Sequence, residues 1–153
     1  MSVFNSLGSN YTFSFVLKSL FAPNNKIYSL SLKNFLEKKY GGKVILTYKG
    51  REAIELALKI LNLPKDSWVA INGFTCYAVY KSIVNAGCNV EFVDIEEDLN
   101  FSPEKLKIIL KFNPKIRVVI IQNTLGYPCE IEEIGKICKE NNCKKTFSGR
   151  SRS

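Results

Sequence analysis

The residues best suited to chemistry in this sequence stand where an apolar run gives way to a helical pattern. Residues 72–79 read NGFTCYAV and place Phe74, Cys76 and Tyr77 at such a junction. A planar aromatic side chain can stack there on the flat ring of a ligand. These three residues are therefore candidates for the wall of a cofactor pocket. Alternatively, one of the two aromatic side chains packs in the core and the other covers the N-terminal arm, and neither binds a ligand.

A glycine at a second junction suits the binding of a phosphate. The stretch TYKGREAIELAL places Gly50 at the start of a helical pattern and Arg51 directly after it. Glycine lets a ligand approach the backbone closely, and the amides at a helix N-terminus attract an anion. Gly50 and Arg51 are candidates for this role, and the alternative is a tight turn into a helix that packs on the core.

Two further loops carry polar side chains. QNTLGYP follows an apolar run and offers Gln122, Asn123 and Thr124 as hydrogen-bonding groups toward a shared cleft, or as satisfied turn residues. The loop FVDIEEDLNFSPEKL is acidic, and we expect its carboxylates to cap and solvate a surface turn, in place of acid–base or metal chemistry. Its five acids are Asp94, Glu96, Glu97, Asp98 and Glu104.

Composition excludes several kinds of site. The 153 residues include no histidine, which removes Ser–His and Cys–His nucleophile pairs and the usual metal ligand. The five cysteines form no CxxC pair, so neither zinc nor a disulfide framework is favoured. No apolar run reaches the ~18 residues of a membrane span, and YTFSFVLKSLFAP has the pattern of an amphipathic arm. We therefore expect a cytoplasmic protein without a membrane partner.

The positive charge of the chain is partly local. The formal net charge is +8, and half of it lies in the last ten residues, which contain no acid. Because the other lysines are dispersed, we do not expect a nucleic-acid partner. A basic α/β domain that binds nucleic acid is the alternative, and it requires charge gathered on one face.

The elements that must position these residues alternate along the chain. Strands are expected at 44–48, 68–71, 89–95 and 116–122, and helices at 29–39, 51–61, 76–86, 102–112 and 130–141. This alternation predicts an α/β fold with three layers, a mainly parallel sheet with helices on both faces. In such sheets ligands bind beyond the carboxyl ends of the strands, where the four loops begin.

Some helix ends and one strand can be predicted in more detail. We expect Ser29 or Ser31 to cap the helix at 29–39, and we expect Thr75 to cap the helix at 76–86. Ser102 and Pro103 suit the first turn of the helix at 102–112. The run IRVVIIQ is almost wholly apolar and β-branched, which is typical of a strand buried on both faces.

Taken in order, these motifs resemble a known family. An aromatic–Gly helix stop, a Gly turn that opens a helix, GFTC after a strand, AG before a strand ending in VD, and NTLGYP follow one another. Over residues 28–142 they resemble the N-terminal half of the large domain of DegT/DnrJ/StrS-type aminotransferases. The resemblance implies a truncated aspartate-aminotransferase-like fold and pyridoxal 5′-phosphate (PLP) as cofactor. It leaves residues 1–27 as an N-terminal arm and 143–153 as a basic tail outside the family pattern.

The resemblance also implies roles for single residues. Gly50 and Arg51 match the pair whose backbone amides bind the cofactor phosphate, while Lys49 stands where the family usually has a small residue, often Ser. Cys76 falls where many members place the aromatic that stacks on the pyridoxal ring. Its neighbours Phe74 or Tyr77 could substitute for that aromatic. Asn123 falls near a loop position that faces cofactor and substrate.

What the family does follows from the same resemblance. Many members aminate keto-sugars on nucleotide carriers for nucleotide-sugar or polysaccharide biosynthesis, using a small-molecule amino donor and a sugar acceptor, usually as homodimers. Their Schiff-base lysine and the aspartate that pairs with the ring nitrogen lie beyond the matched region, and no acid follows Glu140 here. We therefore expect a fragment from a truncated or frameshifted gene that is inactive alone. The alternative is a module that a partner chain completes, or a binding module without catalytic activity.

Overall fold

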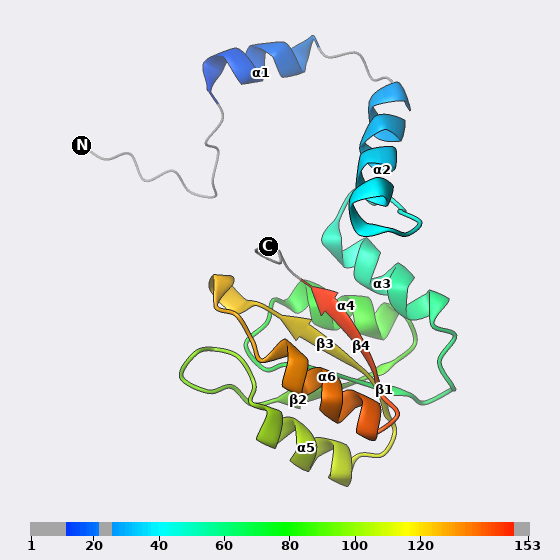
Figure 1. Cartoon of the computed structure of the whole chain (residues 1–153), viewed down its shortest axis with the longest axis vertical. Helices are drawn as coiled ribbons and strands as arrows, with labels where there is room; N and C mark the ends of the chain where they lie inside the picture. Colours follow the sequence, from blue (N-terminus) through cyan, green and yellow to red (C-terminus); the bar gives the residue numbers. More distant parts are fainter. Residues whose placement is uncertain (1–11, 22–25, 149–153) are drawn as a thin grey trace, which may run out of the picture. The chain divides into compact units, whose positions relative to one another are not determined.

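The chain divides into two compact units, residues 1–46 and 47–153. Figure 1 shows a computed structural model of the chain, which describes residues 12–21 and 26–148. None of the helices in this described part is long and apolar enough to cross a membrane.

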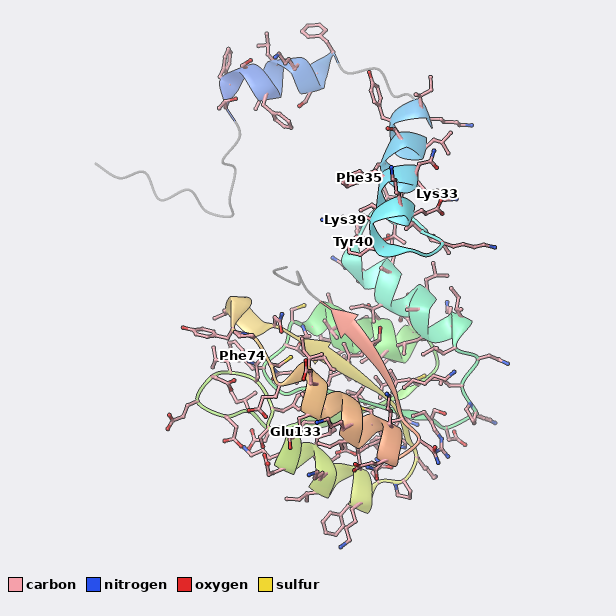
Figure 2. The ribbon with its side chains drawn as sticks, viewed as in Figure 1. Lys33, Phe35, Lys39, Tyr40, Phe74 and Glu133 are labelled. Carbon is pink, nitrogen blue, oxygen red and sulfur yellow. The ribbon has the colours of Figure 1, made fainter. Side chains whose placement is uncertain are left out.

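The first unit holds two helices, α1 (Phe13–Leu20) and α2 (Lys26–Tyr40). The side chain of Thr12 caps α1 by accepting a hydrogen bond from the Phe15 amide at 3.3 Å. Gly41, with φ of +67°, ends α2, and this left-handed conformation favours glycine. Figure 2 shows Lys39 beside Tyr40 on α2, with the Lys39 Nζ 5.6 Å from the ring centroid.

Two predictions for this region are wrong. The helix begins at Lys26, so Ser29 and Ser31 lie inside α2 and neither caps it. The strand predicted at 44–48 is irregular chain, and Ile45 is 64% exposed. A short β-branched run forms a strand only where a neighbouring strand completes its hydrogen bonds. The Val44 amide instead donates a hydrogen bond to the Glu37 side chain at 3.0 Å.

The second unit is a three-layer α/β structure, which confirms the predicted fold class (Figure 1). All four strands of its sheet run parallel, in the order β2-β1-β3-β4. In chain order the elements are α3 (Gly50–Ile60), β1 (Trp68–Asn72), α4 (Tyr77–Asn85), β2 (Asn89–Val93), α5 (Pro103–Phe112), β3 (Ile116–Gln122), the 3-10 turn η1 (Thr124–Gly126), α6 (Ile131–Glu140) and β4 (Lys144–Ser148).

An apolar core lies on each face of the sheet. On one face, Leu58 of α3 and Ile83 of α4 pack against β1 and β3. On the other face, Leu106 of α5 and Ile134 of α6 pack against alternate residues of the same strands. Residues 118–121 of β3 have no exposed surface, which confirms the strand buried on both faces. Burial of each such aliphatic side chain stabilises the fold by roughly 1.5–3 kcal/mol.

The fourth strand is formed by residues that the sequence analysis assigned to the basic tail. β4 pairs with β3 from Val118 opposite Lys144 to Gln122 opposite Ser148. The first residues of the tail thus belong to the sheet. The pattern KKTFS gave no sign of this, because two lysines open it and only one large apolar residue follows.

Candidate functional site

The carboxyl ends of β1 and β3 form the switch point of the sheet. From β1 the chain passes through α4 to β2 on one side, and from β3 it passes through α6 to β4 on the other side. α4 and α6 pack on opposite faces (Figure 1). In open parallel sheets, ligands bind in the crevice outside the strand ends where such connections diverge.

One hydrogen bond joins the two loops at this switch point. The hydroxyl of Thr75, after β1, donates to Oε1 of Gln122, at the end of β3, at 2.7 Å. The prediction that Thr75 caps α4 is therefore wrong: Cys76 is the N-cap residue, and its side chain makes no capping bond. The threonine is used to connect two neighbouring strands that lie 47 residues apart in sequence.

A buried asparagine connects the loop after β1 to the loop after β2. Asn72, 1% exposed, donates from Nδ2 to the Leu99 carbonyl and accepts at Oδ1 from the Phe74 amide, both at 2.7 Å. The Gly73 amide donates to the Val93 carbonyl at 2.8 Å. A Cβ at residue 73 would lie 3.1 Å from that oxygen, so glycine permits this close approach. The loop after β1 is thus fixed to its neighbours on both sides.

The N-terminus of α3 lies at the same edge of the sheet. α3 packs beside α4 and is followed by the chain that enters the amino end of β1, so its own first residue points to the carboxyl edge. Lys49 is the N-cap and gives no side-chain cap. Glu52 instead accepts from the Tyr48 amide at 3.2 Å. Among the described residues, no acceptor meets the amides of Gly50 and Arg51, which leaves this helix end open to an anion.

The three candidate ring residues differ in their surroundings. Phe74 is 49% exposed and lies at the carboxyl end of the sheet (Figure 2). Cys76, two residues further along the chain, is exposed. Tyr77 instead contacts Tyr80, with ring centroids 5.6 Å apart, and Tyr80 stacks on Phe92 of the edge strand β2. Phe74 and Cys76 thus stay exposed in the loop after β1, while the ring of Tyr77 contacts Tyr80, which stacks on Phe92 of the outer strand.

In the loop after β3, Asn123 bonds to another residue of the same loop. Oδ1 of Asn123 accepts from both the amide and the thiol of Cys129, each at 3.3 Å. Burial raises the pKa of the Cys129 thiol, which keeps it a donor. Within this loop it is Gln122 that reaches the loop after β1. Sequence reasoning named Gln122 as a polar group of the cleft, but it missed the pairing with Thr75.

The acidic loop after β2 is also occupied with its own contacts. The Asn100 amide and side chain donate to the Asp98 carboxylate at 3.0 and 3.1 Å, and these bonds lower the pKa of Asp98. Lys105 pairs with Glu96 at 3.2 Å. In the described part of the chain, no three His, Cys, Asp or Glu side chains are grouped to hold a metal ion.

Comparison with known proteins identifies the family of the chain. The model of the DegT/DnrJ/EryC1/StrS aminotransferase family matches residues 19–144. The chain belongs to this aminotransferase family. The family resemblance noted from the motifs is thereby confirmed, and the match extends on both sides of residues 28–142.

Individual relatives place the chain within larger proteins of this family. GDP-perosamine synthase of Vibrio cholerae is 31% identical over 108 residues, which are 70% of this chain and 28% of that protein. A structure of E. coli GDP-4-keto-6-deoxy-D-mannose-3-dehydratase with bound hydrated PLP has the same fold, with a TM-score of 0.72 and 22% identity over 92% of this chain and 39% of that one.

A second solved structure leads to the same fold assignment. Helicobacter pylori PseC, an aminotransferase involved in the biosynthesis of pseudoaminic acid, matches with a TM-score of 0.72 and 18% identity over 89% of this chain and 37% of that chain. The chain therefore corresponds to well under half the length of these relatives.

Proposed function

We propose that residues 47–148 of this aminotransferase-family chain form part of a PLP site, with the phosphate at the N-terminus of α3 and the ring in the crevice between β1 and β3. The observation that carries the proposal is the pair of open amides at Gly50 and Arg51, at the edge where Thr75 and Gln122 join the two loops. The fit of each end of the cofactor can be judged from these residues.

The phosphate end fits well. A serine or threonine N-cap would accept a hydrogen bond from one of the first amides, but Lys49 cannot accept one. Its ammonium and the Arg51 guanidinium add positive charge near a dianion. A Cβ at Gly50 would meet no atom within 4 Å apart from its chain neighbours and its own helix, so other parts of the chain do not crowd this residue.

The ring end fits in part. We expect Phe74 and Cys76 to flank the ring, because the Thr75–Gln122 bond fixes the loop that carries them. Bound PLP supplies an electron sink for the carbon that carries the amino group. The chain's contribution is to hold the ring in one orientation by contact with Phe74 and to place Asn123 at the rim of the site.

We further propose that the complete protein aminates a keto-sugar on a nucleotide carrier, from a small-molecule amino donor, as a homodimer in the cytoplasm. The family match and the similarity to GDP-perosamine synthase support this substrate class. Neither a nucleic acid nor a metal enters this proposal.

Residues 1–153 alone are expected not to catalyse transamination. Residues 141–153 contain no Asp or Glu that could pair with the ring nitrogen. Lys144 and Lys145 lie on β4, and neither matches the position of the family's Schiff-base lysine. Within the described residues β4 pairs with β3 alone, and its other edge is open to a further strand. The expected turnover of the purified chain with PLP, an amino acid and a nucleotide keto-sugar equals that of free PLP. Turnover above that level would contradict the proposal.

Protection of Cys76 tests the location of the site. Pyridoxamine 5′-phosphate has no aldehyde and cannot label lysines, so it is the suitable probe. At roughly ten times its dissociation constant, alkylation of Cys76 should slow about tenfold. Cys88, at the amino edge of the sheet before β2, is the internal control and should react at an unchanged rate. Pyridoxamine, which lacks the phosphate, should protect neither. Equal rates for Cys76 with and without the phosphorylated probe would contradict the site.

A further inference from the structure

A concavity toward the amino edge of the sheet takes no part in the proposed PLP site. It is formed by the start of β1, the edge strand β2 and the end of α5, and its volume is about 410 Å³. It belongs to the second unit and lies within the family match, and its strands are on the side of the sheet away from β4. A concavity of this size suits a small molecule. Its lining residues are Trp68, Glu91, Ile109, Phe112, Asn113 and Lys115.

Glu91 breaks the apolar pattern of its face of the sheet. Its neighbours on this face are Ala70, its register partner on β1, and Val93, two residues further along β2, and both are fully buried in the core. Glu91 itself is half-buried. A carboxylate on the core-facing side of a sheet costs free energy unless donors or a cation pair with it. In the described part of the chain, neither Glu91 nor the nearby Lys115 forms an ion pair.

One side chain positions both of these charged residues. Asn113, the C-cap residue of α5, donates from Nδ2 to Oε2 of Glu91 at 2.8 Å and accepts at Oδ1 from the Lys115 amide at 3.2 Å. The Lys115 carbonyl in turn accepts from the Trp68 amide at 3.0 Å. Oε1 of Glu91 has no donor among the described residues. A carboxylate and an ammonium are thus held at one concavity without bonding to each other.

Two aromatic side chains supply apolar surface to the same concavity. Trp68 is half-buried and packs against the core, whereas Phe112, the last residue of α5, is 81% exposed. Aromatic rings bind apolar groups and stack on other rings. The concavity therefore combines an apolar surface, a carboxylate and an ammonium. A free α-amino acid complements all three, because its ammonium, carboxylate and side chain are attached to a single carbon.

We propose that this concavity binds a free α-amino acid with an apolar or aromatic side chain. The ammonium of the amino acid lies at Glu91 and its carboxylate at Lys115. Its side chain lies against Trp68 and Phe112. This binding site is at the other edge of the sheet from the proposed PLP site, and it does not depend on PLP binding.

The fluorescence of Trp68 tests the proposal on the full chain, because Trp68 is the only tryptophan in the sequence. L-phenylalanine, which does not absorb where tryptophan is excited selectively, should change this fluorescence to saturation. N-acetyl-L-phenylalanine lacks the ammonium and should bind about tenfold more weakly. L-phenylalaninamide lacks the carboxylate and should bind about threefold more weakly, since Lys115 is exposed. This ligand series uses the unmodified chain and needs no variant to fold.

A matched pair of variants assigns the ammonium contact to one residue. Glu91→Gln should weaken the binding of L-phenylalanine about tenfold, and it should remove most of the difference between L-phenylalanine and its N-acetyl derivative. Glu104→Gln is the control, because it makes the same change at an exposed glutamate in the first turn of α5, outside the concavity. This variant should bind as the unmodified chain does.

Three results would overturn the proposal. The first is the absence of a saturable change in Trp68 fluorescence with L-phenylalanine. The second is equal affinity for L-phenylalanine and its N-acetyl derivative, or an equal loss of binding in Glu91→Gln and Glu104→Gln. The third is tighter binding of guanosine 5′-diphosphate than of L-phenylalanine at this tryptophan, since the concavity would then be a nucleotide site.

Discussion

Two loops that leave neighbouring strands at the same edge of the sheet use their polar side chains differently. In the loop after β2, residues 94–101, the carboxylates are bonded locally, although the Asn100 side chain also donates to the Tyr127 carbonyl at 3.4 Å. Asp98 accepts from Asn100, two residues away, and Glu96 pairs with Lys105, nine residues away. This loop can satisfy its carboxylates before the sheet is assembled.

In the loop after β1, residues 73–76, the bonds are long-range. Asn72 reaches Leu99, 27 residues away, and Thr75 reaches Gln122, 47 residues away. These bonds exist only when β1, β2 and β3 are side by side. The contacts of the candidate site are therefore a product of sheet assembly, whereas the carboxylates of the acidic loop beside it are satisfied by residues close in sequence.

The largest effect is expected at Asn72. Asn72→Ala would leave the Leu99 carbonyl and the Phe74 amide without their partner in a buried position. The free energy of unfolding, measured by urea denaturation, should fall by about 3 kcal/mol. Asp98→Ala, in the local loop, should cost clearly less. A larger loss at Asp98 than at Asn72 would reverse the comparison.

A smaller effect is expected from the bond between Thr75 and Gln122. Thr75→Val keeps the shape of the side chain and removes the hydroxyl, while Gln122→Leu removes the acceptor. A double-mutant cycle in urea should give a coupling energy of about 1 kcal/mol. Strictly additive single changes would mean that the two loops are not joined through this bond.

The smallest effect is expected from the pH dependence of the acidic loop. Hydrogen bonds from Asn100 lower the pKa of Asp98, so its carboxylate is favoured in the folded state. The resulting stabilisation is present above the ordinary pKa of an aspartate, and it is lost as the pH falls through the lowered pKa of the folded state. On acidification, the unmodified chain should therefore lose stability more steeply than Asp98→Asn. Parallel curves would show that these bonds contribute nothing.

Much of the fold could be predicted because burial leaves a local pattern. The apolar run of β3 and the Ser102 cap with Pro103 are legible within a few residues, and the Ser102 side chain does accept from the Lys105 amide at 3.2 Å. The predictions failed where a neighbouring strand determines whether a segment forms a strand. Residues 44–48 have strand-like composition but no neighbouring strand, and the lysine-rich β4 becomes a strand because β3 offers its edge.

The candidate site was predictable in its location and less so in its contacts. The rule that ligands bind at the carboxyl edge directed attention to Gly50, Phe74 and Gln122 from the sequence alone. The pairing of Thr75 with Gln122 spans 47 residues, and no local pattern encodes it. Likewise, Tyr77 was separated from the other ring candidates only by its contact with Tyr80.

The most direct test of the account concerns the open amide at residue 50. Gly50 is the first residue of α3 and follows Lys49 in extended conformation, a position that accepts proline without loss of the helix. Gly50→Pro removes this N–H alone, while Gly50→Ala keeps it and adds a methyl group into open space. By calorimetry, Gly50→Pro should bind pyridoxamine 5′-phosphate about tenfold or more weakly, and Gly50→Ala should bind it as the unmodified chain does. Equal affinity in all three would contradict a phosphate site at the N-terminus of α3.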